Sequence, residues 1–157
     1  KMFKKLFSTL ILFLVMVTNS SLGFAQTAKT VKPVKPVEYS TVSAVEIANK
    51  PKTYIGKNVK FTATFNKFST IGLDYKPAMR SSKEYISFLI KRDNIKDHTV
   101  PLSELKIFLK REKAEKLVDL ETGDKIEVKG KVFANALGDA WMDAYEVVNL
   151  EPKTQKK

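Results

Sequence analysis

The feature that most restricts the fold of this chain is a run of strictly alternating side chains between residues 58 and 66. Val59, Phe61, Ala63 and Phe65 are apolar, and the residues between them are polar. Successive side chains of a β-strand point to opposite faces, so this pattern predicts a strand with one face in a core and the other in solvent. Such a strand needs a sheet to pair with.

Two further segments predict its partners. Residues 85–90 are rich in aromatic and β-branched side chains, which are typical of strands. Residues 125–132 alternate, and Gly130 within them predicts a β-bulge or a close approach of two backbones. A hairpin turn at residues 135–140 joins this segment to a last strand over residues 141–150. The pattern leaves open which face of that last strand is buried.

The remaining elements are predicted from capping and composition. Ser43 and Glu46 have the spacing of a capping box, which predicts a short helix that begins at residue 44 and stops at the following proline. Residues 73–76, between a glycine and a proline, predict a weak strand. Residues 101–120 have the composition of a helix, and its firmer part is expected at residues 111–119.

Three strands, a helix and a closing hairpin resemble the order of the OB-fold, a five-stranded Greek-key barrel. The segments Tyr-Ile-Gly-Lys-Asn-Val at residues 54–59 and Gly-Asp-Lys-Ile-Glu-Val-Lys-Gly-Lys-Val at residues 123–132 look like those that mark exported bacterial OB-fold domains. The resemblance covers residues 42–150 and is greatest to the periplasmic OB-fold proteins, many of which have no assigned enzymatic role. It implies a mainly β fold, with a helix between strands three and four.

The first 25 residues have the three parts of a secretory signal peptide. Lysines precede an apolar run at residues 6–17, and small residues lead to a cleavage site before Gln26. A helix of this length spans about 18 Å, which is short of a bilayer core of about 30 Å. We therefore expect an exported protein, periplasmic or secreted, with no stable transmembrane anchor after cleavage; an uncleaved anchor is the alternative.

The sequence after this signal divides into three expected parts. Residues 26–39 are rich in lysine and proline and predict an extended linker, residues 40–151 form the OB-fold domain, and residues 152–157 are a basic tail. The net charge is +11 for the whole chain, and it falls to +8 without the three lysines of the signal. This charge favours anionic partners but does not distinguish among them.

The chain lacks the residues from which common catalytic and metal sites are built. It has no cysteine and a single histidine, His98, in a polar loop, so we expect no zinc or copper site and no cofactor. No nucleophile motif such as G-x-S-x-G occurs. Asp139, Asp143 and Glu146 lie close together in the last hairpin, but nothing gives one the role of acid and another that of base. We therefore expect that the protein is not an enzyme.

The usual binding surface of an OB-fold uses strands two and three and the loops after strands one and four. In this chain those elements supply aromatic side chains interleaved with cations, namely Lys67, Phe68, Tyr75, Lys76, Arg80, Tyr85 and Lys131. Trp141, the single tryptophan, joins them as a stacking platform if it faces outward. Phe68, Tyr85 and Trp141 also suit a barrel core, and the sequence leaves both placements open.

Two functions are compatible with these features. The first is a non-enzymatic module of the cell envelope that binds an anionic polymer, a lipid surface or a protein. The alternative is a protein that binds single-stranded nucleic acid outside the cytoplasm, because aromatic rings stack on bases while lysines neutralise phosphates. The predicted export favours the first function.

Overall fold

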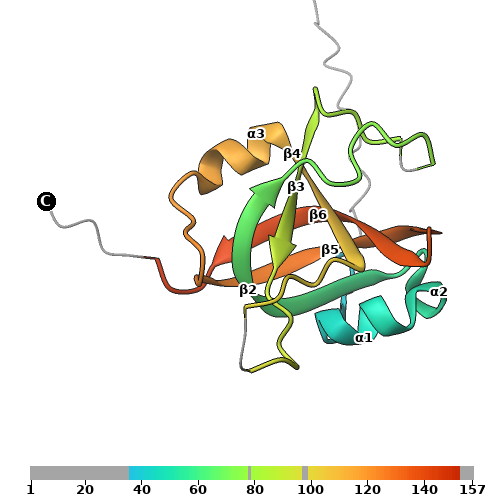
Figure 1. The fold of residues 1–157 in the computed structure, drawn as a ribbon, viewed down its shortest axis with the longest axis horizontal. Coiled ribbons are helices and arrows are strands. Elements are labelled where there is room, and N and C mark those ends of the chain that lie inside the picture. Colours follow the sequence, from blue (N-terminus) through green and yellow to red (C-terminus); the bar gives the residue numbers. More distant parts are fainter. Residues whose placement is uncertain (1–35, 78, 97–98, 153–157) are drawn as a thin grey trace, which may run out of the picture. The chain divides into compact units, whose positions relative to one another are not determined.

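Five of the six strands close into a barrel, which Figure 1 shows as a ribbon. The computed structural model describes residues 36–152 apart from residues 78, 97 and 98, so the predicted signal, most of the predicted linker and His98 lie outside the described residues. The strands are β1 (Ser40–Thr41), β2 (Asn58–Ser69), β3 (Tyr85–Ile90), β4 (Leu105–Lys110), β5 (Lys125–Ala136) and β6 (Asp139–Asn149). The helices are α1 (Ala44–Asn49), α2 (Pro51–Tyr54), α3 (Arg111–Ala114) and the 3-10 turn η1 (Glu115–Leu117).

The order of the strands around the barrel is that of an OB-fold. The sheet runs β1-β2-β3-β4-β6-β5, and β2 also pairs with β5, which closes the cylinder. The first half of β2 pairs with β5, and its second half pairs with β3, so one long curved strand forms hydrogen bonds with two neighbouring strands. Only β4 and β6 run parallel within the barrel. With α3 and η1 between the third and fourth barrel strands, this arrangement confirms the predicted mainly β, five-stranded Greek-key fold.

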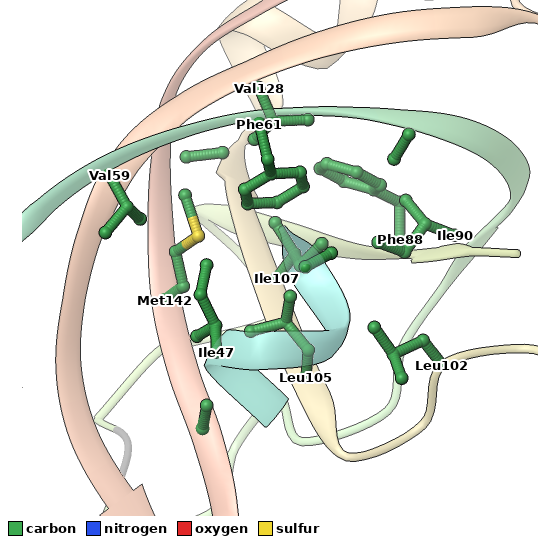
Figure 2. Packing of buried hydrophobic residues seen from close by; sticks show 14 of the residues in the cluster. Ile47, Val59, Phe61, Phe88, Ile90, Leu102, Leu105, Ile107, Val128 and Met142 are labelled. Atoms are coloured by element: carbon green, nitrogen blue, oxygen red, sulfur yellow. The ribbon is translucent and has the colours of Figure 1, made fainter. Parts of the chain in front are cut away.

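The barrel interior includes Val59, Phe61, Ala63 and Phe65, the residues of β2 that the alternating pattern predicted to be buried. Phe61 and Phe88 from β2 and β3 meet Ile107 from β4, and all three are fully buried (Figure 2). Helix α1 closes one end of the barrel, where Ile47 points toward Leu105 (Figure 2). Aliphatic and aromatic packing of this density supplies most of the stability of a domain this size.

Helix α1 begins as its capping residues predict. The Ser43 hydroxyl accepts a hydrogen bond from the backbone N–H of Glu46 at 3.1 Å, which satisfies one of the helix's free donors. The Glu46 carboxylate accepts a hydrogen bond from the Tyr54 hydroxyl at 2.8 Å, which ties α1 to α2. Pro51 ends α1 and also starts α2, where a proline fits because the first turn needs no backbone donor.

The prediction of a helix over residues 101–110 was wrong, because this segment forms strand β4. Leu105, Ile107 and Leu109 face the interior, while Phe108 is equally buried on the outer side. A strand buried on both faces loses its alternating pattern, and the spacing of Leu105, Phe108 and Leu109 then imitates one face of a helix. The helix that follows is correspondingly short and ends at Ala114, before η1.

The weak strand predicted at residues 73–76 was also wrong, since these residues form turns in a long loop between β2 and β3. The loop covers residues 70–84 and lies at the outside of the barrel. The second and third barrel strands are therefore β3 and β4, one element later in the chain than predicted. Among the described residues, no helix has the length and apolar character needed to cross a membrane.

Gly130 allows β5 and β6 to approach each other closely, as its place in the alternating segment predicted. A Cβ atom at this position would lie 2.0 Å from the carbonyl oxygen of Asp143. The pairing register shifts at the same point, because Lys129 faces Glu146 while Gly130 faces Ala144. The extra residue in this β-bulge is Tyr145. Before the bulge, Met142 and Ala144 of β6 face the barrel interior.

Candidate binding face

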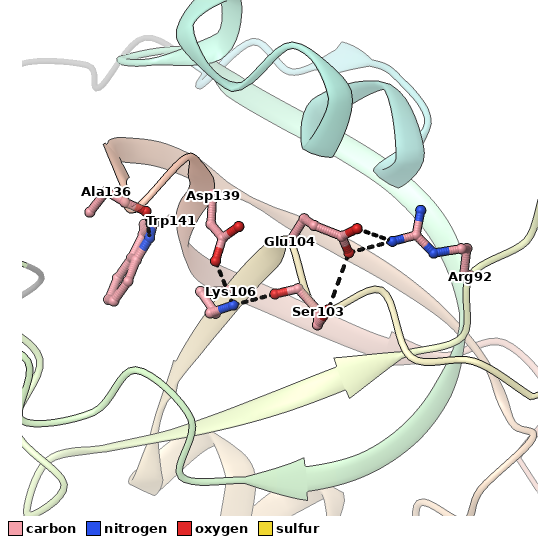
Figure 3. Close-up of polar contacts among 7 residues, drawn as sticks. All are labelled: Arg92, Ser103, Glu104, Lys106, Ala136, Asp139 and Trp141. Carbon is pink, nitrogen blue, oxygen red and sulfur yellow. Dashed lines mark hydrogen bonds and ion pairs between the residues drawn. The ribbon is translucent and has the colours of Figure 1, made fainter.

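A second apolar cluster lies on the outer side of β4 and β6. Phe108 and Trp141 form its centre, with 0% and 1% of their surface exposed, and their rings stack with centroids 5.5 Å apart. The indole N–H of Trp141 donates a hydrogen bond of 2.9 Å to the carbonyl of Ala136 (Figure 3). Trp141 therefore faces outward from the barrel and is nevertheless buried, which combines the two placements that the sequence left open.

The loop at residues 70–84 covers this cluster, which is the part of an OB-fold where ligands usually stack. Tyr75 lies with its ring centroid 5.5 Å from that of Trp141, and Leu73 packs against the same cluster. Gly72 approaches so closely that an added Cβ atom would stand 3.1 Å from the Phe108 ring and 3.2 Å from that of Trp141. The aromatic platform of the face is thus occupied by the protein's own loop.

Polar contacts hold the loop in a compact turn. The backbone N–H of Asp74 donates to the carbonyl of Arg80 at 2.8 Å, and the Asp74 carboxylate accepts the backbone N–H of Ser82 at 2.9 Å. The hydrogen bonds from the side chain and the backbone of Ser82 lower the pKa of Asp74, and the charge of Lys83 lowers it further. The loop therefore has internal structure of its own.

Arg80 fastens the loop to the barrel. Its guanidinium donates two hydrogen bonds to the Asp143 carboxylate, at 2.7 and 2.5 Å. The same group lies over the Phe133 ring at 4.2 Å and the Tyr85 ring at 5.4 Å. The hydrogen bonds to Asp143 raise the pKa of Arg80, so its charge is fixed at every ordinary pH. This predicted ligand-binding cation is committed to contacts within the protein.

Beside this ion pair, the face opens into a hollow of about 340 Å³. Its lining combines aromatic, cationic and acidic side chains, namely Tyr85, Lys110, Glu112, Lys113, Asp143, Ala144 and Tyr145. Lys113 donates to the backbone carbonyl of Tyr145 at 2.5 Å, and Lys110 is exposed at the rim. Burial raises the pKa of Tyr145, as does the nearby charge of Asp143, so the hydroxyl stays neutral and can donate a hydrogen bond.

The structure brings together some of the residues predicted for the binding surface. Tyr75, Arg80, Tyr85 and Trp141 all contribute to the covered cluster and its anchor. Lys76 is exposed on the loop, where it lines a shallow depression with Tyr75, Met79 and Arg80. Lys131 lies opposite Asp143 in the register of strands β5 and β6.

Two predicted residues lie elsewhere. The ring of Phe68 packs against the main core, 5.1 Å from that of Phe65, and does not join the outer cluster. Lys67 is exposed on the same stretch of β2. The prediction placed them on the loop after the first barrel strand, whereas β2 extends through Ser69 and holds both within the barrel wall.

Other residues of the face could not be found from the sequence. Lys110 and Lys113 lie in the segment that was expected to have helical composition, and Tyr145 lies on a strand whose orientation the sequence left open. They come together because β4 ends at Lys110 next to the bulge at Tyr145 in β6. Pairing between strands far apart in the chain, which carries no local pattern, determines this meeting.

The carboxylates of the last hairpin each take part in an ion pair. Asp139 accepts a hydrogen bond of 2.7 Å from Lys106 (Figure 3), Asp143 pairs with Arg80, and Glu146 lies 3.3 Å from Lys129. Within the part of the chain that the structure describes, no group of three or more acidic or histidine side chains is placed to hold a metal ion. These carboxylates therefore act as structural partners of lysines and arginines.

A further ion pair joins the loop after β3 to the start of β4. Arg92 donates to both oxygens of the Glu104 carboxylate, as Figure 3 shows. Burial raises the pKa of Glu104, but a backbone hydrogen bond and the Arg92 guanidinium lower it by more, so the net pKa lies below its ordinary value. Neither residue of this pair lines the hollow.

The excess positive charge of the chain lies mainly outside the barrel. Residues 40–152 carry 19 lysines and arginines against 16 acidic residues, whereas the segments on either side carry nine lysines and one acidic residue. The barrel itself is therefore close to neutral, and its face owes any attraction for anions to the local placement of a few lysines.

No family model and no curated protein matches this sequence. Among solved structures, the chain is similar to an aspartyl-tRNA synthetase from Leishmania major Friedlin, with 9% identity, a TM-score of 0.48, and 81% of this chain and 24% of that chain covered. This chain thus spans about a quarter of the synthetase.

It is also similar to two OBody proteins bound to hen egg-white lysozyme. OBody AM1L10 has 14% identity and a TM-score of 0.47, with 76% of this chain and 100% of that chain covered. OBody AM3L09 has 14% identity and a TM-score of 0.42, with 62% and 85% covered. Because these scores are low, the assignment of the OB-fold rests on the strand order of the barrel, and the resemblance to periplasmic OB-fold proteins stays a prediction.

Proposed function

We propose that this chain is an exported, non-enzymatic OB-fold binding module of the cell envelope that recognises an anionic polymer, lipid surface or protein. The observation that carries the proposal is the hollow beside the Arg80–Asp143 pair, at the place where an OB-fold usually binds ligands. Tyr85 and Tyr145 offer ring faces and hydroxyls there, and Lys110 and Lys113 offer charge. Such a site supplies contacts and orientation for a ligand.

The absence of enzymatic activity is part of the proposal and is supported by the state of the carboxylates. Asp143, one of the two acids that line the hollow, is held by the two hydrogen bonds from Arg80. Glu112 is exposed at the rim. Acid–base catalysis needs one carboxyl group that donates a proton and one that accepts a proton, placed on either side of a bound substrate. A carboxylate held in an ion pair and a carboxylate exposed at the rim do not provide this arrangement.

The export and the periplasmic character of the module are supported by sequence alone. The signal-like first 25 residues and the two OB-fold segments are the grounds for both. The basic segments on either side of the barrel would add a non-specific attraction to anionic surfaces of the envelope, which salt would screen.

Binding of single-stranded nucleic acid is the alternative function. The fold and the lysines of the face favour it, since OB-folds bind such strands in grooves that combine rings with cations. The covered state of Phe108 and Trp141 counts against it, because the rings on which bases would stack are occupied by Tyr75 and Leu73. We therefore rank it second.

Binding of the purified chain to soluble anionic polymers, measured against salt concentration, tests the proposal. Lys110→Gln should weaken binding by about fivefold, because one exposed ion contact is worth about 1 kcal/mol. Lys67→Gln is the matched control, because this lysine is also exposed, lies on β2 and does not line the hollow. Tyr145→Ser should also weaken binding.

Equal loss in the Lys110 and Lys67 variants would contradict a specific site and leave only non-specific charge attraction. Stronger binding to single-stranded oligonucleotides than to other polymers of equal charge density would support the alternative function instead.

A further inference from the structure

Two large apolar side chains stand in solvent at the tips of the two loops that flank the binding face. Met79, in the loop at residues 70–84, is 82% exposed, and Leu137, in the turn between β5 and β6, is 77% exposed. Both residues have left-handed backbone conformations, with φ of 51° and 57°. Residues with a side chain rarely adopt this conformation, and asparagine, aspartate or glycine are the usual occupants.

The mismatch between residue type and backbone conformation is clearest in the turn at Leu137. Leu137 and Gly138 both have positive φ, which is the geometry of a two-residue hairpin turn of type I′. Asn-Gly is the favoured pair in such a turn, because the first position also needs a left-handed residue. A leucine there costs stability and gains no burial in return. The fold of the chain therefore gives no reason for either Met79 or Leu137.

The two tips belong to one surface. Leu73 from the loop and Ala136 from the hairpin both pack against the cluster of Phe108 and Trp141. Trp141 also bonds to the Ala136 carbonyl and contacts the ring of Tyr75. The buried tryptophan thus holds the loop and the hairpin turn together, and Figure 1 shows both on the same side of the barrel.

We propose that Met79 and Leu137 insert into the surface of an anionic lipid bilayer and dock this face of the barrel on it. The proposal rests on the proposed function and names the lipid surface as its partner. Lys76 is exposed beside Tyr75, and among the described residues no carboxylate pairs with it, so its ammonium can meet lipid headgroups while the two tips enter the acyl boundary.

The separation of the two tips favours a bilayer over other partners. Single protruding side chains on two different loops fit a deformable apolar phase, whereas a folded protein would need two matching pockets. Methionine and leucine have no flat ring on which the bases of a nucleic acid could stack. The lysines that precede and follow the barrel in the sequence add long-range attraction to anionic lipids.

Site-specific labelling tests which surface meets the lipid. The chain has no cysteine, so Met79→Cys, Leu137→Cys and Val118→Cys each give a single site for an environment-sensitive fluorophore. Val118 is the matched control, since it is 73% exposed and follows η1, away from both loops. With vesicles of equal parts phosphatidylglycerol and phosphatidylcholine, the emission should shift to the blue at positions 79 and 137 and stay unchanged at 118. Equal shifts at all three positions would overturn the proposal.

Asparagine variants provide a second test that does not depend on a label. Met79→Asn and Leu137→Asn suit the left-handed backbone, so both should fold at least as well as the parent chain. Each should nevertheless lower partitioning onto the anionic vesicles by roughly tenfold, because an apolar side chain is removed from the lipid. Lys76→Gln should lower it by roughly fivefold, and Lys116→Gln, on an exposed part of η1, should not. Unchanged partitioning in both asparagine variants would overturn the proposal.

These experiments distinguish failure of the lipid proposal from failure of the proposed function. If vesicles are not bound but a soluble anionic polymer is bound and responds to Lys110→Gln, the lipid proposal falls and the proposed function stands. If neither is bound, the lipid proposal falls and the proposed function keeps only a protein as its partner. Binding of an oligonucleotide or a protein that is lost in the Met79 and Leu137 variants, without vesicle binding, also overturns the lipid assignment.

Discussion

The inside and the outside of this barrel bury aromatic rings to the same depth by different means. Phe61 and Phe88 are enclosed by side chains from the paired barrel strands and from α1. Phe108 and Trp141, on the outside, are enclosed by a loop whose position depends on one ion pair and a few hydrogen bonds. Two equally buried clusters can therefore differ in how readily they become exposed to solvent.

This difference predicts two levels of opening. Loss of the interior packing should unfold the whole barrel, because each of the five barrel strands contributes to it. Loss of the loop contacts should uncover the outer cluster while the strands stay paired, since local opening needs only the energy of the contacts that it breaks. The single tryptophan lies in the outer cluster, so its fluorescence reports the second event and circular dichroism of the strands reports the first.

The largest effect is expected inside the barrel. Phe61→Ala should lower the free energy of unfolding by about 3 to 5 kcal/mol, because it removes a fully buried ring and leaves a cavity. Denaturant titrations followed by circular dichroism and by tryptophan fluorescence should show one shared transition. Two separate transitions in this variant would break the comparison, because the interior would then no longer be the cooperative unit.

The next effect concerns the anchor of the loop. Asp143→Ala leaves the Arg80 guanidinium, which is largely shielded from solvent, without its bidentate partner. We expect a loss of about 2 kcal/mol, since one partner of a partly buried ion pair is left uncompensated. Acrylamide should quench Trp141 more readily in this variant at denaturant concentrations where the strands remain intact.

The double variant Arg80→Met with Asp143→Leu supplies the control. It removes both charges and keeps apolar volume at the same place, so it should recover much of the loss. If it is as unstable as Asp143→Ala alone, the ion pair is not what holds the loop.

The same comparison explains what the sequence could predict. The interior follows from local patterns: Phe61 and Phe65 alternate with polar neighbours in β2, and Ser43 caps α1. The closed barrel and the helix between its third and fourth strands followed from the order of these elements. The alternation in β2 and the cap of α1 are each encoded within a few consecutive residues, where periodicity and capping act.

The outer face could not be predicted in the same way. Phe108 broke the alternation of β4 because a distant loop covers it, and this made the strand look like a helix. The pairing of Arg80 with Asp143, 63 residues later in the chain, was not predicted either. Contacts between segments so far apart leave no signal in either segment alone.

A smaller effect is expected where the loop touches the rings. Gly72→Ala places a methyl group 3.1 to 3.3 Å from Phe108 and Trp141 and also forces a side chain onto a φ of +84°. The backbone strain costs about 1 kcal/mol, and the displaced rings add to it. Quenching of Trp141 should therefore increase.

Gly56→Ala separates the two causes. Gly56 has a φ of +81° and nothing within 4 Å of the added methyl group, so this variant carries the strain without the contact. It should lower stability by a similar backbone cost and leave the quenching of Trp141 unchanged. Equal quenching in both variants would show that strain, and not the contact with the rings, opens the loop.

The smallest effect is a loosening of the loop in acid. The hydrogen bonds from Ser82 hold the pKa of Asp74 below its ordinary value of 3.8. A carboxyl group with a lowered pKa in the folded state adds stability that is fully present above its unfolded pKa and is lost as the pH falls through the folded one. Trp141 should therefore become more accessible to acrylamide as the pH falls below 3.8, while circular dichroism still reports paired strands. In Asp74→Asn, which can still accept the Ser82 N–H but does not titrate, this step should vanish; its persistence would place the acid sensitivity elsewhere.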